Sequence, residues 1–242
     1  MEFPIEKTTN VHSAKRVAII QSNYIPWKGY FDLIRAVDEL IIFDDMQYTR
    51  RDWRNRNKIK TPNGPLWLSI PVQTKDKYFQ AIRDTKTSEP GWNKRHWKTL
   101  VTNYAKAPHF NTYKNVFEEL YLSPQSDYLS IINITFIHAI CRLLGIQTHI
   151  SQSTDYETAD GKTERLISLC KQAGATSYLS GPSAKGYIDA ALFTDEKINL
   201  HYADYSNYPT YPQLYPPFEH GVSILDLLFN AGPASIQYMK PL

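Results

Sequence analysis

The sequence predicts an α/β protein with a Rossmann-like, mostly parallel sheet and a helical insert. Two short apolar runs, residues 17–20 and 40–43, are typical of fully buried parallel strands. The apolar side chains between them follow helical spacing, so the chain opens with a strand, a helix and a strand. From residue 146 onward, strand-like runs and helical patterns alternate, as expected for a parallel sheet with crossover helices.

Length and composition favour one domain. The chain has 242 residues, of which we expect residues 1–16 to form a flexible leader and residues 17–242 a single α/β domain. The helical insert of this domain is expected at about residues 92–144. The net charge of +3 is too small to indicate a nucleic-acid-binding protein by itself. The 17 Tyr, 10 Phe and 5 Trp suit sites where sugar rings or bases stack, and we expect most of them to build the core.

The sequence indicates neither export nor membrane insertion. Residues 1–16 lack the apolar segment of a signal peptide. The most apolar window, residues 131–144, contains polar side chains and is too short to cross a bilayer. Cys141 and Cys170 lie in apolar surroundings at a spacing that matches no metal site, which indicates buried thiols in a reducing compartment. We therefore expect a cytoplasmic protein without a membrane span, and the sequence carries no signal for an oligomeric state.

The other elements of the first half follow from local patterns. Asn63 and Gly64 are a turn signal ahead of a strand at residues 66–72. Apolar and aromatic side chains at helical intervals predict helices at residues 92–105, 113–121 and 129–144. These three helices form the predicted insert.

In the second half we expect strands at residues 146–150, 177–180 and 198–205, and helices at residues 163–173, about 184–193 and 222–230. Gly174 fits the end of the first of these helices, and Ser223 and Gly232 fit the two ends of the last. Residues 205–218 are rich in Tyr and Pro, and proline stiffens this segment. It either closes one side of a cleft or acts as a structural strap.

Two loops that follow strands are dense in polar and aromatic side chains. Ligands of open α/β sheets bind beyond the carboxyl ends of the strands, so residues 21–29 and 43–60 should open on one rim. Arg offers a planar fork that matches carboxylate or phosphate, and Asn and Gln add neutral donors and acceptors. The substrate-binding candidates on this rim are Gln21, Tyr24, Trp27, Tyr30, Gln47, Arg51, Trp53, Arg54, Asn55 and Arg56, and Asp45 is a catalytic candidate. The alternatives are a solvated charged turn, and, for Trp27 and Tyr30, a cover over the first strand.

Further candidates lie on a helix, a turn and the Tyr- and Pro-rich segment. His96, with Lys94 close by, is a candidate general acid or base because imidazole titrates near neutrality; the alternative is a structural histidine on an aromatic helix. Residues 180–187 form a strand-to-helix turn whose backbone amides and lysine suit a phosphate, although the P-loop spacing is absent. The substrate-binding candidates here are Lys94, Ser180, Gly181, Ser183, Lys185, Tyr187, Tyr211 and Gln213.

Two features of the turns keep a structural alternative open. Any tight strand-to-helix turn favours Gly and Ser, so the composition of residues 180–187 does not require a ligand. Lys162 and Thr163 stand at another predicted helix start, where a simple N-cap explains Thr163 as well as an anion site does.

Seven motifs together resemble the WbqC-like protein family. They are QSNYIPWKGYFDLI, FDDMQYTRRDWRNRN, LWLSIPV, KRHWKTL, YLSGPSAKGYID, YPQ and SILDLLFN, in this order. The resemblance spans residues 17–232, and it implies a protein encoded with the machinery for O-antigen and other surface polysaccharides. It adds Gly29, Tyr48, Ser223 and Asp226 to the polar and aromatic signature. The family usually has Pro where this chain has Ser22, so the first loop here lacks one rigid element.

The resemblance implies a transferase that forms an amide by acyl or aminoacyl transfer to a nucleotide-linked amino sugar. Arg51, Arg54 and Arg56, or the turn at residues 180–185, would hold the diphosphate, and His96 or Asp45 would accept the proton of the attacking amine. An activated acyl donor is the co-substrate, and no metal or tightly bound cofactor is expected. The alternative is a non-enzymatic module that binds a nucleic acid or a glycan through the same Arg and aromatic surface.

Overall fold

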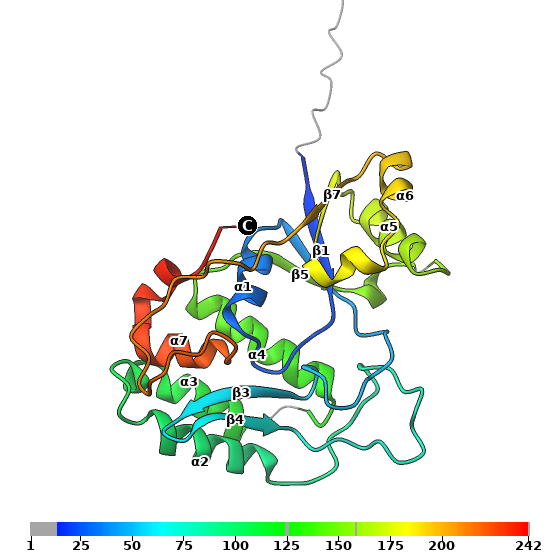
Figure 1. Ribbon diagram of the computed structural model, residues 1–242. Helices are drawn as coiled ribbons and strands as arrows, with labels where there is room; N and C mark the ends of the chain where they lie inside the picture. Colours follow the sequence, from blue (N-terminus) through cyan, green and yellow to red (C-terminus); the bar gives the residue numbers. More distant parts are fainter. Residues whose placement is uncertain (1–13, 124–125, 158, 242) are drawn as a thin grey trace, which may run out of the picture.

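The computed structural model describes residues 14–123, 126–157 and 159–241, and a five-stranded parallel sheet forms its centre (Figure 1). The strands are β1 (Arg16–Ile20), β2 (Glu39–Ile42), β5 (His149–Gln152), β6 (Ser177–Ser180) and β7 (Asn199–Tyr202). Their order is β5-β2-β1-β6-β7, and every pair runs parallel. The chain therefore proceeds outward from β1 in both directions, which confirms the predicted Rossmann-like fold. Residues 1–13 of the predicted leader lie outside the described residues.

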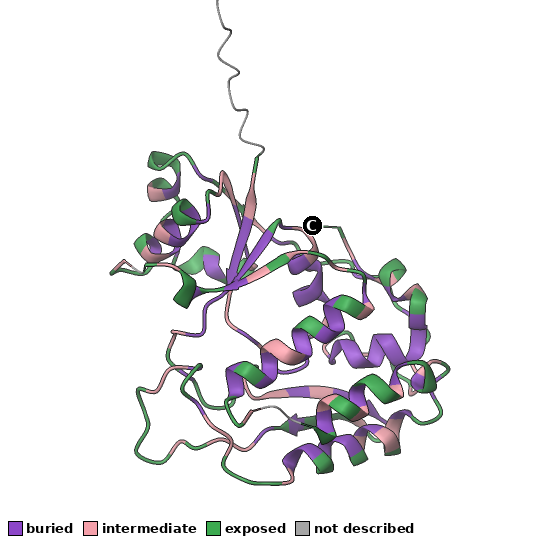
Figure 2. Ribbon diagram, turned by 180° about the vertical axis from the view of Figure 1, so that it is seen from behind, coloured by how far each residue is buried: buried purple, intermediate pink, exposed green. Residues whose placement is uncertain are grey.

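Helices cover both faces of the sheet. They are α1 (Lys28–Arg35) and α4 (Leu129–Leu143) on one side, and α5 (Thr163–Gln172) and α6 (Ala190–Asp195) on the other (Figure 1). Helix α7 (Ile224–Ala231) lies further from the sheet, in the same core as α1 and α4. Alternate residues of β1 serve the two layers, because successive strand side chains point to opposite faces. Ala18 belongs to the core of the first layer, and Val17 and Ile19 belong to that of the second. Figure 2 shows the resulting burial of the central strands, with exposed residues on the outer sides of the helices.

The predicted helical insert consists of α2 (Trp92–Tyr104), α3 (Phe110–Leu122) and α4. It lies beside a two-stranded antiparallel hairpin of β3 (Arg56–Thr61) and β4 (Gly64–Ser69), and both are set beyond the carboxyl ends of the sheet strands (Figure 1). Leu40 of the sheet, Leu100 of α2 and Phe229 of α7 belong to one cluster of buried side chains. The sheet and the insert therefore share a continuous core. In the described part of the chain, no helix is long and apolar enough to span a membrane.

Strand β5 begins three residues later than predicted, and the structure differs in kind from the sequence-based elements in two further places. Strand β3 falls inside the stretch that we interpreted as a polar loop, because its outward positions carry charges, including Arg56 and Lys58, while Asn57 and Ile59 are buried. The helix predicted at about residues 184–193 is divided into η2 (Pro182–Gly186) and α6. Asp189 ends the interruption, since its carboxylate accepts a hydrogen bond from the backbone N–H of Ala191 and caps α6. The other short 3₁₀ helices are η1 (Ser153–Asp155) and η3 (Gly232–Tyr238).

Candidate functional site

A cleft of about 730 Å³ opens at the carboxyl end of β1. It adjoins the point between β1 and β6 where the strand order reverses, which is where open α/β sheets bind their ligands. The lining residues are Ile19, Ile20, Gln21, Phe43, Met46, Gly161, Lys162, Arg165, Leu166, Tyr178 and Tyr187. They come from β1, the end of β2, the start of α5, β6 and the residue that follows η2.

Two cationic side chains flank the start of α5 at this cleft. Lys162 is the exposed N-cap residue, and Arg165 lies in the first turn. The guanidinium of Arg165 is positioned by its Nε, which donates to the Ala159 carbonyl at 3.1 Å, and by Nη1, which lies 3.9 Å from the sulfur of Met46. The first N–H groups of a helix lack intrahelical acceptors and carry partial positive charge. The cations and the helix start together favour an anionic ligand group.

The other walls of the cleft combine a fixed backbone with aromatic and apolar side chains. The carbonyl of Gln21 accepts hydrogen bonds from the Tyr30 hydroxyl at 3.1 Å and from Nη1 of Arg54 at 3.3 Å. Tyr187 is 59% exposed, and the buried ring of Phe43 contributes an apolar surface. A ligand that has both an anionic group and a ring therefore finds complementary groups here.

A buried polar centre holds the loop after β1 in place. The Asp44 carboxylate accepts hydrogen bonds from the Ser22 backbone N–H at 2.8 Å, from the Ser22 hydroxyl at 2.6 Å and from the Ser130 hydroxyl. Asn133 of α4 donates to the Ser22 hydroxyl at 3.1 Å and to the Arg54 carbonyl at 2.9 Å. Ser22 thus compensates through hydrogen bonds for the rigidity that a proline would bring at this position.

The predicted turn at residues 180–187 lies at the same edge of the sheet, but its residues have different environments. Ser180 is buried at the end of β6, and Gly181 follows it directly. Ser183 and Lys185 are exposed on η2, and the Lys185 ammonium lies 5.2 Å from the ring centre of Tyr202. Among the lining residues of the cleft, this turn contributes its last residue, Tyr187.

Asp45 is the sequence neighbour of a residue that lines the cleft, and its carboxylate already has two partners in the protein. It directly precedes Met46, which lines the cleft. Its carboxylate forms an ion pair with Arg83 and accepts a hydrogen bond from the Ser153 hydroxyl. Asp45 is not among the lining residues of the cleft, and its carboxylate contacts two other segments of the chain instead.

His96, the second catalytic candidate, lies in the aromatic core of the insert. It is 7% exposed, and its Nδ1 is 2.9 Å from the hydroxyl of the fully buried Tyr24. The Tyr24 hydroxyl also lies 2.6 Å from that of Tyr121. Burial lowers the pKa of His96 to about 4. Because Tyr24 and His96 are enclosed by protein groups, we leave both out of the proposed site.

Trp27 and Tyr30 pack against other parts of the protein. The Trp27 ring lies 5.1 Å from that of Tyr205 and 5.4 Å from that of Tyr208, both in the Tyr- and Pro-rich segment. It also folds back over Gly29, where any Cβ atom would overlap the indole. Tyr30 is buried on α1. Both residues therefore have packing contacts, and those of Trp27 are with the Tyr- and Pro-rich segment rather than with the first strand.

Tyr211 and Gln213 belong to a buried network around Asp226 of α7. The Asp226 carboxylate accepts hydrogen bonds from Tyr211 at 2.6 Å, from Gln213 at 2.8 Å and from Tyr104 at 2.7 Å. The Tyr- and Pro-rich segment is thereby tied to α7 and α2. This placement agrees with a structural strap rather than with one wall of the cleft.

The remaining candidates are not among the residues that line the cleft: Gln47, Arg51, Trp53, Arg54, Asn55, Arg56 and Lys94. Arg54 braces the loop after β1, since its guanidinium also reaches the Ser22 carbonyl at 3.4 Å. Asn55 donates to the Ile70 carbonyl and Gln47 to the Tyr78 carbonyl, each at 2.8 Å. The candidates predicted for one rim therefore do not form one site. Gln21 lines the cleft, Arg54 holds the loop after β1, and Arg51, Trp53 and Arg56 lie at the β3–β4 hairpin.

Of the lining residues, the sequence-based candidates include only Gln21 and Tyr187, and the polar or charged side chains they miss include Lys162 and Arg165, with Met46 beside them. The segment Asp160 to Leu166, DGKTERL, did carry a signal, because a lysine at a helix start follows a glycine there. An N-cap explained that pattern equally well, and Arg165 has the spacing of an ordinary surface residue. The order of the strands in the sheet brings the start of α5 to the cleft, and the local sequence pattern does not reveal that order.

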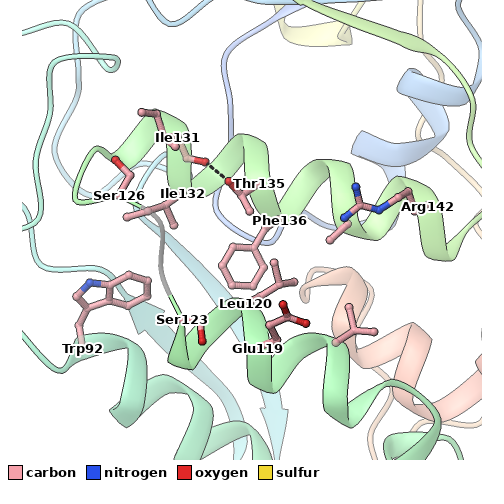
Figure 3. A pocket seen from close by; sticks show the side chains of 12 residues that line it. Trp92, Glu119, Leu120, Ser123, Ser126, Ile131, Ile132, Thr135, Phe136 and Arg142 are labelled. Carbon is pink, nitrogen blue, oxygen red and sulfur yellow. Dashed lines mark hydrogen bonds between the residues drawn. The ribbon is translucent and has the colours of Figure 1, made fainter.

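A second hollow of about 230 Å³ lies between α3 and α4 (Figure 3). Its lining is largely apolar and includes Trp92, Ile131 and Phe136, with Glu119 and Arg142 toward one end. Thr135 donates its hydroxyl to the Ile131 carbonyl at 2.7 Å within α4. This hollow has one cation and one carboxylate in its lining, so it offers less to an anionic ligand than the cleft does.

The strand order and the cleft define an α/β protein with a candidate ligand site at the switch point of a parallel sheet. The chain belongs to the WbqC-like protein family, whose profile matches residues 21–238. It is 52% identical over 226 residues to the uncharacterized protein Rv1507c of Mycobacterium tuberculosis, an alignment that covers 93% of this chain and 98% of the relative. No solved structure matches the chain. The family resemblance seen in the motifs is therefore confirmed.

Proposed function

We propose that this protein is a transferase of surface-polysaccharide biosynthesis that forms an amide on a nucleotide-linked amino sugar bound in the cleft. The observation that carries the proposal is the pair of cations, Lys162 and Arg165, at the start of α5 beside the switch point. A nucleotide sugar has a diphosphate between two ring systems, and this cleft offers an anion-binding centre with aromatic and apolar walls. Family membership supports the same substrate class.

In this proposal the diphosphate lies against Lys162, Arg165 and the first N–H groups of α5. Tyr187 stacks on the base or the sugar, and Phe43 contacts the other ring. This assignment replaces Arg51, Arg54 and Arg56 as the diphosphate ligands. The reason is that Arg54 is engaged with the loop after β1, and neither Arg51 nor Arg56 lines the cleft.

The proposed reaction passes an acyl or aminoacyl group from an activated donor to the sugar amine. The amine nitrogen attacks the acyl carbon, the new C–N bond forms, and the bond between the acyl carbon and the leaving group of the donor breaks. The amine must lose a proton, and Asp45 is the proposed acceptor, as it directly precedes Met46 in the cleft wall. The buried thiols of Cys141 and Cys170 fit a reducing, cytoplasmic location.

A binding experiment tests the site. Thermal unfolding is followed with dTDP- and UDP-linked amino sugars, and a ligand at about a hundred times its Kd adds ~2.7 kcal/mol to the free energy of unfolding. Lys162→Ala should weaken binding about tenfold or more, because a hydrogen bond to a charged group contributes roughly 1.5–3 kcal/mol. Lys171→Ala is the matched control on the same helix, where Lys171 pairs with Glu196. Absence of binding, or an equal effect of both variants, contradicts the proposal.

A product experiment tests the reaction. The protein, a sugar nucleotide that binds and a panel of activated acyl and aminoacyl donors are incubated, and mass spectrometry detects the acylated sugar nucleotide. Asp45→Asn should lower the turnover rate by roughly a hundredfold, the scale of general-base catalysis, with little change in sugar-nucleotide affinity. Binding without any product would leave a sugar-nucleotide-binding protein and overturn the transferase assignment.

A further inference from the structure

The β3–β4 hairpin and the loop before it expose two neighbouring tryptophans, Trp67 of β4 and Trp53 of the loop. Trp53 is 42% exposed and Trp67 is 40% exposed, whereas Trp92 and Trp97 of the insert are buried. The ring centres of Trp53 and Trp67 are 5.3 Å apart, and their planes are inclined at 40°. The two indoles are therefore in direct contact, and a large part of each remains exposed to solvent. We call this surface the indole platform.

Cationic side chains border the indole platform. The guanidinium of Arg56 lies 4.2 Å from the ring centre of Trp67, and the Lys58 ammonium lies 5.8 Å from it. Lys58 pairs with Trp67 in the hairpin register, so these side chains lie on one face of the hairpin. Arg56 also donates to the Arg51 carbonyl, while its Nε is buried without a hydrogen-bond partner in the described residues. Arg56 and Lys58 therefore place positive charge beside the indoles, which favours an anionic group there.

We propose that the indole platform binds an acidic glycan, with a pyranose ring on the exposed surfaces of Trp53 and Trp67 and its carboxylate near Arg56 and Lys58. The C–H groups on the faces of a pyranose ring carry partial positive charge and pack against the negative faces of indole rings. A carboxylate matches the planar guanidinium fork. This site is separate from the cleft, because none of these four residues lines the cleft. It therefore does not depend on the proposed transferase activity.

The geometry favours a glycan over single-stranded nucleic acid. A puckered sugar ring contacts two rings inclined at 40°, whereas a flat base stacks on one ring at a time. Nucleic acid also requires a track of cations for its phosphates in addition to stacking rings. Here the cations gather at one end of the platform, over Trp67, and the net charge of the whole chain is +3.

Titration calorimetry tests the glycan site. The probes are tetragalacturonate, a hyaluronan tetrasaccharide and trimeric sialic acid, with maltotetraose as the neutral comparison. We expect at least one acidic probe to bind, and maltotetraose to bind at least tenfold more weakly. Trp67→Ala should weaken binding tenfold or more, and Arg56→Gln should reduce the preference for the acidic probe. Phe79→Ala is the control for an exposed aromatic ring outside the platform, since Phe79 is 84% exposed, and it should change affinity less than twofold.

Oxidation of the unmodified protein provides a test that does not depend on the folding of a variant. N-bromosuccinimide oxidises exposed indoles, and peptide mass spectrometry should show Trp53 and Trp67 oxidised in the free protein and protected by the acidic probe. Binding of a single-stranded oligonucleotide in place of all three acidic glycans overturns the proposal. So does the absence of any binding, or a sedimentation result in which Trp67→Ala converts a dimer into a monomer.

Discussion

The cleft at the carboxyl ends of the parallel strands and the network around Asp226 contain similar types of residue. They differ in whether the polar groups are hydrogen-bonded within the protein or exposed to solvent. In the network, Tyr211, Gln213 and Tyr104 all donate to one buried carboxylate. In the cleft, Lys162 and Tyr187 are exposed at the end of a parallel sheet. Buried polar groups paired with one another hold a fold together, whereas exposed ones at a concave edge are available to a ligand. The partners of a side chain therefore decide its role more than its type does.

Substitution of Asp226 should produce the largest loss of stability. Asp226→Ala removes the acceptor of two buried donors, Tyr104 and Tyr211, and of the half-buried Gln213; each unsatisfied buried donor costs roughly 1–3 kcal/mol, so we expect a loss of roughly 2–6 kcal/mol. Urea unfolding followed by circular dichroism measures this loss. Glu196→Ala, which removes a surface ion pair with Lys171, is the control and should change the free energy of unfolding by less than ~1 kcal/mol. Equal effects of the two variants would mean that the network is not structural.

His96 should make the protein less stable in mild acid. Its pKa is lowered by burial from 6.5 to about 4, so the neutral imidazole is the stable form in the folded protein. The stabilisation is present above pH 6.5 and is lost as the pH falls toward 4, by up to about 3 kcal/mol. Urea unfolding at pH 7.5, 6.0 and 5.0 should therefore show falling stability in the natural protein.

His96→Gln keeps a polar group near Tyr24 but removes the titration, so its stability should vary less between pH 7.5 and 5.0. A natural protein whose stability is unchanged over this range would contradict the buried placement of His96. Such a result would return His96 to the set of catalytic candidates.

Gly29→Ala should produce a smaller loss, even though alanine favours helices. A Cβ atom at Gly29 overlaps the Trp27 indole and forces it away from Tyr205 and Tyr208. Overpacking of this kind costs about 1–3 kcal/mol. Gly186→Ala is the control, because a Cβ atom there meets no atom of the described residues within 4 Å. If the two variants unfold at the same urea concentration, Trp27 is not held against the strap.

The central strands β1 and β2 were predictable because they are short, largely apolar runs, whereas the polar edge strand β5, predicted at residues 146–150, is observed at His149–Gln152. β1, β2 and β6 were expected within about one residue of their observed ends, since burial on both faces leaves a clear pattern. Strand β3 was not predicted, because it belongs to a separate hairpin with one solvent-facing side, and its outward charges matched the pattern of a polar loop. The division of the helix after β6 into η2 and α6 was not predicted either, because it depends on the cap that the Asp189 side chain forms at the start of α6.

The candidate site was harder to predict, because the burial of a side chain in the fold determines whether it can reach a ligand. Tyr24 and Tyr187 were equal candidates in the sequence, but Tyr24 is fully buried beside His96, and Tyr187 is exposed at the cleft. Gln21 lines the cleft at the carboxyl end of β1, the position expected from its place directly after this strand. Lys162 and Arg165 are distant from Gln21 in the sequence, and only the order of the strands joins them in one cleft.

A crystal structure of the complex with a dTDP- or UDP-linked amino sugar tests the central claim most directly, which is that the cleft holds the sugar nucleotide. We expect the diphosphate within hydrogen-bonding distance of Lys162 and Arg165, and a ring of the ligand against Tyr187. A diphosphate bound instead at Arg56 and Trp67 of the hairpin, with the cleft at Gln21 and Met46 unchanged, would contradict the account.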